Sequence, residues 1–216
     1  MGNVLSDTLH ASRFTPDDPF AHIRRMRDHR FPHEIASILP GEFFVSRDPM
    51  IVYTVLGSCI SACIRDPVAG VGGMNHFMLP APTGRQSGDA WGGESTRYGS
   101  YAMESLINEI LKRGGLKSRL EVKLFGAGKI YDGNIDIGAR NAEWVLSFLK
   151  TEGLASAKTD LGDVCPRKVY YFTDSGRVLM KKLERLKNKT IFERESEYAA
   201  KITSVKQQPE EDVTLF

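Results

Sequence analysis

The chain has 216 residues, with 29 Lys and Arg against 27 Asp and Glu, and therefore a formal charge of +2. This length predicts one large domain with additional segments at its ends, able to form a core without disulfides or metal ions. The near-neutral charge argues against a dedicated nucleic-acid-binding protein, since such domains usually have a pI above about 9. No apolar run approaches the roughly 18 residues of a membrane span, and the N-terminus lacks the apolar core of a signal peptide. We expect a cytoplasmic protein without membrane insertion.

The chain contains three cysteines, Cys59, Cys63 and Cys165. A small, odd number of cysteines is not typical of a secreted disulfide framework. The count leaves room for one reactive thiol, and identifying that thiol becomes the main question that the sequence poses.

Residues 1–40 are predicted to form a polar N-terminal extension, because they contain scattered prolines and no sustained hydrophobic period. The basic stretch 22–30 is typical of a solvated helical turn, with an anion-binding surface as the alternative. Aromatic residues do not alternate with these basic residues as they do in nucleic-acid grooves.

Extended structure is predicted for four short segments in the first half of the chain. Residues 51–56 are β-branched and aromatic, which is typical of a buried strand. The other candidate strands are 43–45, 59–64 and 71–79. Because the three segments 51–56, 59–64 and 71–79 follow one another closely, we expect these three to pair as an antiparallel meander.

Helices and strands mix in the second half. After a loop at 80–93, helical spacing predicts helices over 95–113 and 139–150. Further strands are expected at 120–125 and 156–161, with a hairpin formed by 168–172 and 177–181. The pattern predicts an α/β layered sandwich of the α+β kind, with mixed, largely antiparallel strands packed with two main helices. We expect this domain over 41–183, followed by a charged helix and tail over 184–216.

Cys59 and His76 form the candidate catalytic pair. His76 is the only histidine in the domain predicted over 41–183, and it lies 17 residues after Cys59. If Cys59 opens one strand and His76 ends the next, the turn between the strands brings them together. A thiol needs a nearby base or cation to become the nucleophilic thiolate. The alternative is that Cys59 is a small buried apolar residue.

Gly57 and Ser58 directly precede this cysteine. A glycine at this position permits a tight turn that exposes the thiol and directs backbone N–H groups at a developing oxyanion. An ordinary hairpin glycine is the alternative.

Metal and phosphate sites are weaker hypotheses. Cys59 and Cys63 point to one face of a strand but are separated by roughly 13 Å, whereas zinc holds each sulfur at about 2.3 Å. Residues 126–129 contain Gly-Lys but lack the GxxxxGK[ST] spacing of a phosphate loop. We therefore expect no metal and no cofactor.

Several blocks of the sequence resemble the chemoreceptor glutamine deamidases of the CheD family, over roughly residues 40–183. The blocks are LGSCI at 56–60, DP at 66–67, GGMNHFMLP at 72–80, RYGSYAME at 97–104, KLFGAG at 123–128, IGARN at 137–141, DLG at 160–162 and GRVL at 176–179. The resemblance implies hydrolysis of glutamine side chains on methyl-accepting chemotaxis receptors, a CheC-type phosphatase as a possible partner, and an α/β sandwich fold.

The resemblance implies Cys59 as nucleophile and His76 as the acid–base residue, with a third residue that carries a hydroxyl. In one member of the family a threonine stands six residues before the cysteine, where this chain has Tyr53, with Thr54 one residue later. A slip of one residue reverses the face of a strand. Either a bulge redirects Thr54, which we favour, or another hydroxyl such as that of Ser58 orients His76. The chain also departs from the family pattern at Ala127 and Asp163.

Two other functions compete with this hypothesis. The first is a non-enzymatic adaptor that binds chemoreceptors or a CheC-type phosphatase without deamidating. The second is a deamidase for a glutamine of another protein, with Trp91 and Arg97 in or beside the long loop available to touch a helical substrate. Both side chains could instead pack the loop onto the core.

Overall fold

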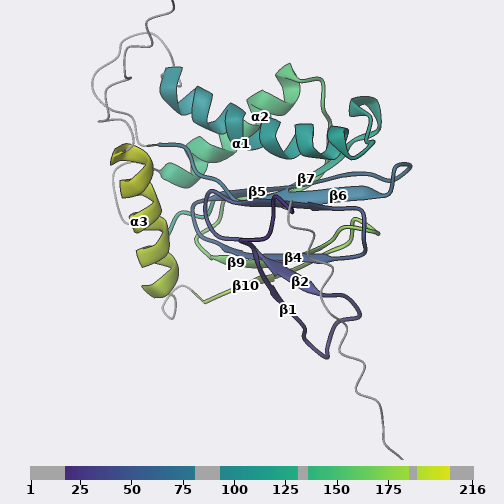
Figure 1. The fold of residues 1–216 in the computed structure, drawn as a ribbon. Coiled ribbons are helices and arrows are strands. Elements are labelled where there is room, and N and C mark those ends of the chain that lie inside the picture. Colours follow the sequence, from purple (N-terminus) through teal and green to yellow (C-terminus); the bar gives the residue numbers. More distant parts are fainter. Residues whose placement is uncertain (1–17, 81–92, 131–135, 185–188, 205–216) are drawn as a thin grey trace, which may run out of the picture.

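The fold is a sandwich of two five-stranded sheets with helices outside it (Figure 1). The computed structural model describes residues 18–80, 93–130, 136–184 and 189–204. In the first sheet the strands follow the order β1 (Arg24–Met26), β2 (Ile35–Ser37), β4 (Ile51–Leu56), β9 (Arg167–Phe172), β10 (Val178–Lys182). In the second sheet the order is β3 (Phe43–Ser46), β6 (Val71–Asn75), β5 (Ile60–Asp66), β7 (Glu121–Gly126), β8 (Ser156–Leu161).

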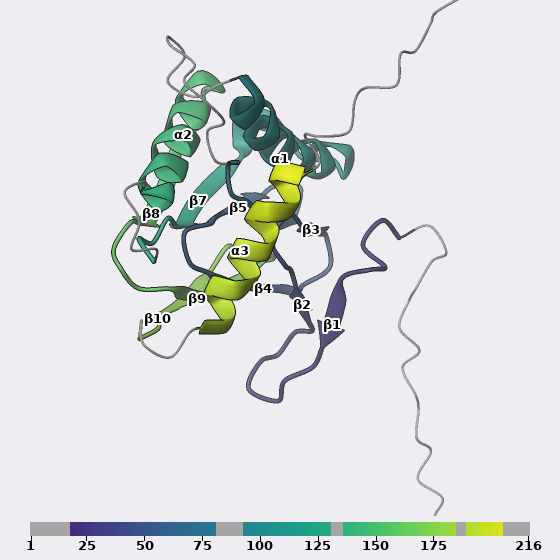
Figure 2. The ribbon, with the colours of Figure 1, turned by 90° about the vertical axis from the view of Figure 1, so that its left-hand side faces the viewer.

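The helices cover two sides of this sandwich. The helices α1 (Gly93–Lys112) and α2 (Ile137–Thr151) lie on the outer face of the second sheet, and a short 3₁₀ turn (Lys117–Arg119) follows α1. The third helix, α3 (Lys189–Ser204), lies across one end of the sandwich, running from the level of α1 to the level of β9 (Figure 2). The predicted α+β layered fold is thus confirmed, and the third helix is packed against it.

The core lies between the two sheets and between the second sheet and its helices. Strand β4 shows how the sequence produces this arrangement: Val52, Thr54 and Leu56 are buried on its inner face. Tyr53 lies on the opposite face, where its ring centroid is 4.8 Å from that of Tyr170 on β9. β5 and β6 are buried almost throughout because sheet and helices cover both of their faces.

The expected meander is wrong in one respect. β4 pairs with β2 and β9 in the first sheet, whereas β5 pairs antiparallel with β6 and β7 in the second. The chain therefore crosses from one sheet to the other between β4 and β5, through Gly57, Ser58 and Cys59. The antiparallel pairing of β5 with β6 and the hairpin of β9 with β10 agree with the prediction.

The segment expected as an extension contributes to the folded unit. β1 and β2 continue the first sheet beyond β4, and Phe20 and Ile23 are buried in the core. Strands of three residues carry too few positions for a period of two to be recognised, which explains why the sequence pattern does not indicate them.

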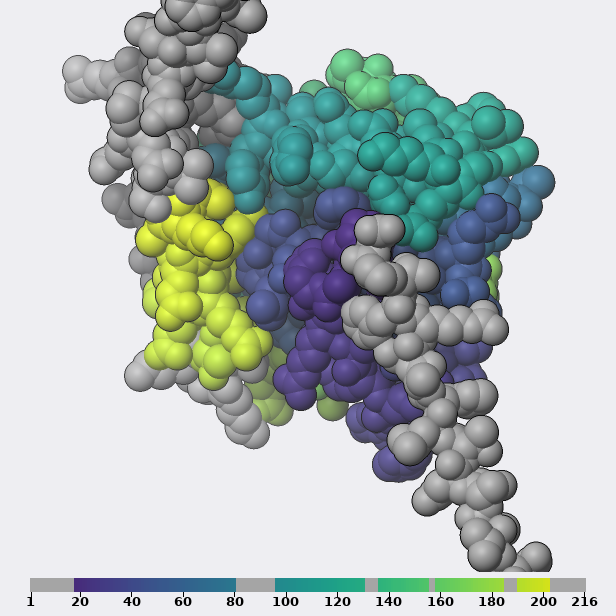
Figure 3. Space-filling model, in the orientation of Figure 1, coloured from purple at the N-terminus to yellow at the C-terminus, as the bar shows by residue number. Residues whose placement is uncertain are grey.

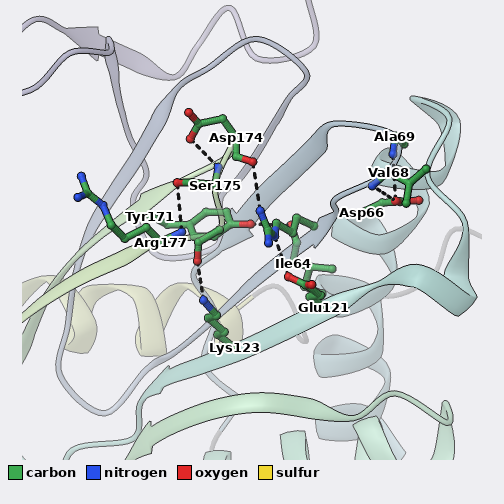
Figure 4. A network of polar contacts seen from close by, with 12 residues as sticks. Ile64, Asp66, Val68, Ala69, Glu121, Lys123, Tyr171, Asp174, Ser175 and Arg177 are labelled. Carbon is green, nitrogen blue, oxygen red and sulfur yellow. Dashed lines mark hydrogen bonds and ion pairs between the residues drawn. The ribbon is translucent and has the colours of Figure 1, made fainter.

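A polar network joins the two sheets at the end of β5 that lies away from Cys59 (Figure 4). The Arg65 guanidinium on β5 donates to the Asp174 carbonyl at 3.1 Å and pairs with Glu121 at 2.8 Å. Lys123 on β7 donates to the Gly176 carbonyl at 2.6 Å, and the Tyr171 hydroxyl donates to the Ile64 carbonyl at 3.2 Å. These bonds hold the turn between β9 and β10 against the second sheet.

Candidate active site

Cys59 and His76 meet at one end of the second sheet. Cys59 directly precedes β5, and His76 follows β6. Two backbone hydrogen bonds between Ile60 and Phe77, of 2.8 and 2.9 Å, hold the two segments side by side. The Cys59 Sγ, one ring nitrogen of His76 and one carboxylate oxygen of Glu195 all lie within 4.8 Å of one another. The structure therefore brings together the two residues singled out in the sequence and adds a third.

Thr54 lies against the other side of the imidazole. Its Oγ1 is 2.7 Å from His76 Nδ1 and donates to the Ile38 carbonyl at 2.9 Å. Because a hydroxyl has a single hydrogen, and that of Thr54 is donated to Ile38, Oγ1 accepts from Nδ1–H. The Nε2 atom is then the unprotonated nitrogen, and it is buried without a hydrogen-bond partner among the described residues. A nitrogen in that state can accept the thiol proton.

Thr54 reaches His76 without a bulge. β4 pairs with β9 in continuous register from Ile51 to Leu56, and the alternation along β4 directs Thr54 inward. The hydroxyl of Ser58, the other candidate for orienting His76, is used elsewhere: it donates its hydrogen to Glu195 at 2.7 Å and lies 3.7 Å from the Met78 sulfur.

The turn of Gly57, Ser58 and Cys59 is held by its carbonyl groups. The Gly57 carbonyl accepts from Gly128 N at 2.7 Å, and the Cys59 carbonyl accepts from Ala127 N at 2.8 Å. The Ser58 carbonyl accepts from the buried Asn141 side chain of α2 at 2.9 Å. These bonds fix the conformation of the turn. In that conformation its three N–H groups converge on one acceptor.

Asn141 is a site residue whose role the sequence pattern did not indicate. Its Oδ1 also accepts from Leu79 N at 3.0 Å, so one amide connects the turn with the segment after His76. The first turn of α2 is capped by Asp136, which accepts from Ala139 N at 2.9 Å, and Asn141 is therefore not needed as a cap. The only feature of the sequence that pointed to Asn141 is its place in the IGARN block at 137–141, which is one of the blocks shared with the family.

The N–H groups of the turn bind the carboxylate of Glu195, a residue of α3. Oε1 accepts from Gly57 N at 2.7 Å and from Cys59 N at 3.4 Å. Oε2 accepts from Ser58 N at 2.8 Å and from Ser58 Oγ. The Glu195 side chain is buried, with a relative exposure of 1%. The turn is therefore an anion-binding cradle, as an oxyanion hole must be.

Burial and the carboxylate set the protonation of the pair. Burial raises the pKa of the Cys59 thiol well above its usual value, and the charge of Glu195 and a hydrogen bond to it raise it further. Burial also lowers the pKa of His76 to about 3. With Glu195 in place, both the thiol and the imidazole are neutral at pH 7.

Cysteine, histidine and glutamate are also the residue types that bind zinc. In this site, however, the carboxylate already lies against three backbone N–H groups, whose positive ends favour an anion over a cation at that position. The arrangement fits an acyl-transfer site better than a metal site.

The remaining candidates lie away from this cluster. Cys63 is buried inside β5, where burial raises its thiol pKa, and Cys165 is half-buried. Arg97 is exposed on α1, and Trp91 lies outside the described residues. Ala127 and Asp163, the two departures from the family pattern, both adopt left-handed backbone, with φ of 60° and 68°. Glycine adopts that conformation without strain, so both residues stand where the backbone would favour glycine.

Comparisons with known proteins agree with the motifs. Residues 78–182 match the family model described as CheD chemotactic sensory transduction. The chain is 51% identical to a probable chemoreceptor glutamine deamidase CheD of Janthinobacterium sp. (strain Marseille), over 82% of this chain and 87% of the relative. A probable chemoreceptor glutamine deamidase CheD 1 of Dechloromonas aromatica (strain RCB) is 49% identical over 89% of this chain and 94% of its own length. The chain belongs to the CheD family.

Proposed function

We propose that this chain is a protein-glutamine deamidase that converts glutamines of methyl-accepting chemotaxis receptors to glutamates, with Cys59 as nucleophile. The observation that carries the proposal is the cradle of N–H groups beside Cys59 and His76, in which a glutamate side chain is bound. The N–H groups that donate to one carboxylate oxygen would donate in the same way to the single oxygen of a glutamine side chain. The names of relatives at about half identity support the receptor as substrate.

The reaction follows from the positions of Cys59, His76 and the N–H groups of the turn. His76 Nε2 takes the thiol proton, and the Cys59 sulfur attacks the side-chain carbonyl carbon of the glutamine. The N–H groups of the turn stabilise the oxyanion, and the proton on His76 passes to the leaving amide nitrogen, so that ammonia departs from a thioester. His76 then activates water, which cleaves the thioester to glutamate and returns the proton to Cys59.

Thr54 is a positioning residue in this scheme. By accepting Nδ1–H it keeps Nε2 free of a proton and directed at the site. No cofactor is needed, since the nucleophile, base and oxyanion donors all come from the chain.

The setting of the reaction is part of the proposal. Three free cysteines fit the reducing cytoplasm. No helix in the described parts of the chain is long and apolar enough to cross a membrane. A CheC-type phosphatase is a candidate partner on the basis of the family resemblance.

The test is deamidation of a purified receptor cytoplasmic fragment. We expect ammonia release and a mass increase of about 1 Da per modified glutamine, both absent in Cys59→Ala because the covalent route needs the thiol. Cys165→Ala is the matched control, a half-buried thiol outside the cluster, and it should retain activity. Equal activity of Cys59→Ala would overturn the mechanism, and receptor binding without any ammonia would favour the adaptor.

A further inference from the structure

Helix α3 carries a buried glutamate in the middle of its packing face. Ile191, Glu195, Tyr198 and Ile202 follow one another at intervals of three and four residues, so they share one side of the helix. Ile202 and Glu195 are buried and the other two are half-buried. A position of this kind normally holds an apolar residue, because burying a charge is costly unless it is paired.

The partners of Glu195 are unusual for a buried charge. Among the described residues, no Lys or Arg forms an ion pair with it, and its donors are the three N–H groups of the turn and the Ser58 hydroxyl. An apolar residue at this position could pack the helix as well, but it would leave the N–H groups of the turn without an acceptor. The position is explained better by the cradle, which binds an acyl oxygen, than by the needs of the core.

Glu195 has the structure of the reaction product. A glutamate side chain differs from glutamine only by an oxygen in place of the amide nitrogen, and deamidation makes that replacement. Oε1 of Glu195 occupies the position expected for the oxyanion, against Gly57 N and Cys59 N. An oxygen of the same carboxylate lies within 4.8 Å of the Cys59 sulfur. Helix α3 thus presents to the site what a product-bearing helix would present.

The helix also closes the site. Cys59 has a relative exposure of 0% and His76 of 1%, so an external glutamine cannot reach either in this arrangement. In Figure 3, α3 forms a ridge along one side of the molecule, against the surface of the strands. Tyr198 rests on Gly41, where an added Cβ would lie 2.9 Å from the ring, and its hydroxyl contacts that of Tyr98.

The packing beneath α3 is incomplete. A cavity of about 50 Å³ separates the helix from β2 and β4 and is lined by Ile38, Tyr53, His76, Ile191 and Glu195 among others. Glu195 and Ile202 are the only buried residues in the part of α3 whose burial the structure describes. The void leaves the side chains of α3 that line it without contacts on that side, which lowers the free-energy cost of opening this interface.

We propose that the surface beneath α3 is the substrate-binding surface, that it receives an amphipathic helix carrying the target glutamine in its apolar stripe, and that α3 occupies it as an intramolecular product mimic. This proposal rests on the proposed deamidase function and names the form in which the substrate is presented. The substrate must displace α3 before Cys59 can react.

The electrostatics agree with this assignment. While α3 covers the site, burial and, in addition, the charge of the neighbouring Glu195 carboxylate raise the pKa of the Cys59 thiol, so that the thiol stays protonated and unreactive. When α3 leaves, the negative charge leaves with it, and a neutral glutamine takes its place. Occupation by α3 therefore both blocks the site and suppresses its nucleophile.

The sharpest test converts the mimic into a substrate. In Glu195→Gln, the cradle would hold a glutamine side chain against Cys59, and we expect the chain to deamidate itself. Intact-mass and peptide spectra should show an increase of about 1 Da at position 195 with release of ammonia. The half-time should not depend on protein concentration, because the reaction is intramolecular.

Two controls define this result. Glu197→Gln, an exposed position on the same helix, should keep its amide, and the double variant Cys59→Ala with Glu195→Gln should keep both its amide and its mass. Persistence of the amide in a folded Glu195→Gln chain overturns the proposal, as does equal conversion in Glu197→Gln.

A second experiment works even if Glu195→Gln fails to fold. The full-length Glu195→Ala chain is mixed with a peptide of residues 189–204 that carries Glu195→Gln, with a peptide carrying Glu197→Gln as control. We expect only the first peptide to be deamidated. Towards a receptor fragment, Glu195→Ala should raise kcat/KM about tenfold, mainly by lowering KM, as expected if α3 occupies the site about nine-tenths of the time.

These outcomes separate the two proposals. Receptor deamidation by the wild type, without acceleration in Glu195→Ala and without conversion of either Glu195→Gln substrate, overturns the role of α3 and leaves the deamidase function standing. Self-conversion of Glu195→Gln, with receptor fragments untouched by every variant, supports the role of α3 and overturns the receptor as substrate.

Discussion

Thr54 Oγ1 lies 2.7 Å from His76 Nδ1 and gives its own hydrogen to the Ile38 carbonyl. A strand of the first sheet thereby sets the tautomer of a histidine that follows a strand of the second sheet. The consequence reaches Cys59, because the nitrogen left without a proton is the one available to the thiol. The two sheets must be stacked correctly for the base to function.

Removing this hydroxyl should impair catalysis more than folding. We expect Thr54→Val to lower kcat about 10- to 100-fold, because the imidazole loses the acceptor that orders it. The free energy of unfolding should fall by about 1–3 kcal/mol, since the Ile38 carbonyl loses its donor. Steady-state kinetics on a receptor fragment and urea unfolding measure the two effects.

Thr54→Ser is the matched variant, because it keeps the hydroxyl and loses one methyl group. It should recover most of the lost kcat. Equal impairment in the serine and valine variants would show that packing, and not the hydrogen bond, is what Thr54 provides.

The burial of His76 should make stability depend on pH. Its pKa is about 3 in the folded chain and 6.5 as the ordinary value, so below pH 6.5 the unfolded chain binds a proton that the folded chain does not. The free energy of unfolding is therefore fully maintained above pH 6.5 and falls as the pH drops towards 3, by at most about 1.4 kcal/mol per unit from this residue.

Urea unfolding of the wild type and of His76→Gln at pH 7, 6 and 5 checks this prediction. Glu195 and Cys59 face the imidazole in both proteins, so the comparison isolates the titration of His76. Between pH 6 and 5 the wild type should lose about 1 kcal/mol more than the variant. Parallel pH profiles would contradict a neutral buried imidazole.

Local patterns predicted those parts of the fold that depend on neighbouring residues. The alternation within 51–56 indicated a strand, and the turn between 59–64 and 71–79 indicated that Cys59 and His76 are close. The choice of sheet was not local: β4 pairs with β9, more than a hundred residues further along the chain. The sequence alone suggested that a bulge was needed to turn Thr54 towards His76, because the partner of its strand was unknown. In the structure that partner is β9, and the two strands pair without a bulge.

The occupant of the site illustrates a different limit. Glu195 lies 136 residues after Cys59, in a charged stretch expected to form a peripheral helix and tail. The sequence does show a glutamate within the apolar stripe formed by Ile191, Tyr198 and Ile202. That signal indicates a burial site for a carboxylate but not which part of the molecule provides the donors, because three backbone N–H groups leave no pattern in the sequence.

The cradle itself should be sensitive to a single added methyl group. A Cβ on Gly57 would lie 2.9 Å from both carboxylate oxygens of Glu195 and 2.3 Å from Ile130 Cδ1. The end of the Ile130 side chain can move, but the carboxylate can move only by lengthening its bonds to the N–H groups. A substrate amide would meet the same obstacle. We expect Gly57→Ala to lower kcat/KM about a hundredfold, the effect of losing one oxyanion donor.

Ser58→Ala is the comparison for this variant, because it removes the hydroxyl that contacts Glu195 and keeps all three N–H groups. Its kcat/KM should fall less than about tenfold, since catalysis depends on the N–H groups directed at the oxyanion. Thermal unfolding of both variants checks that the turn still forms. Wild-type activity in a folded Gly57→Ala chain would mean that the substrate oxygen binds elsewhere, and the carboxylate of Glu195 would then not mark the reacting position.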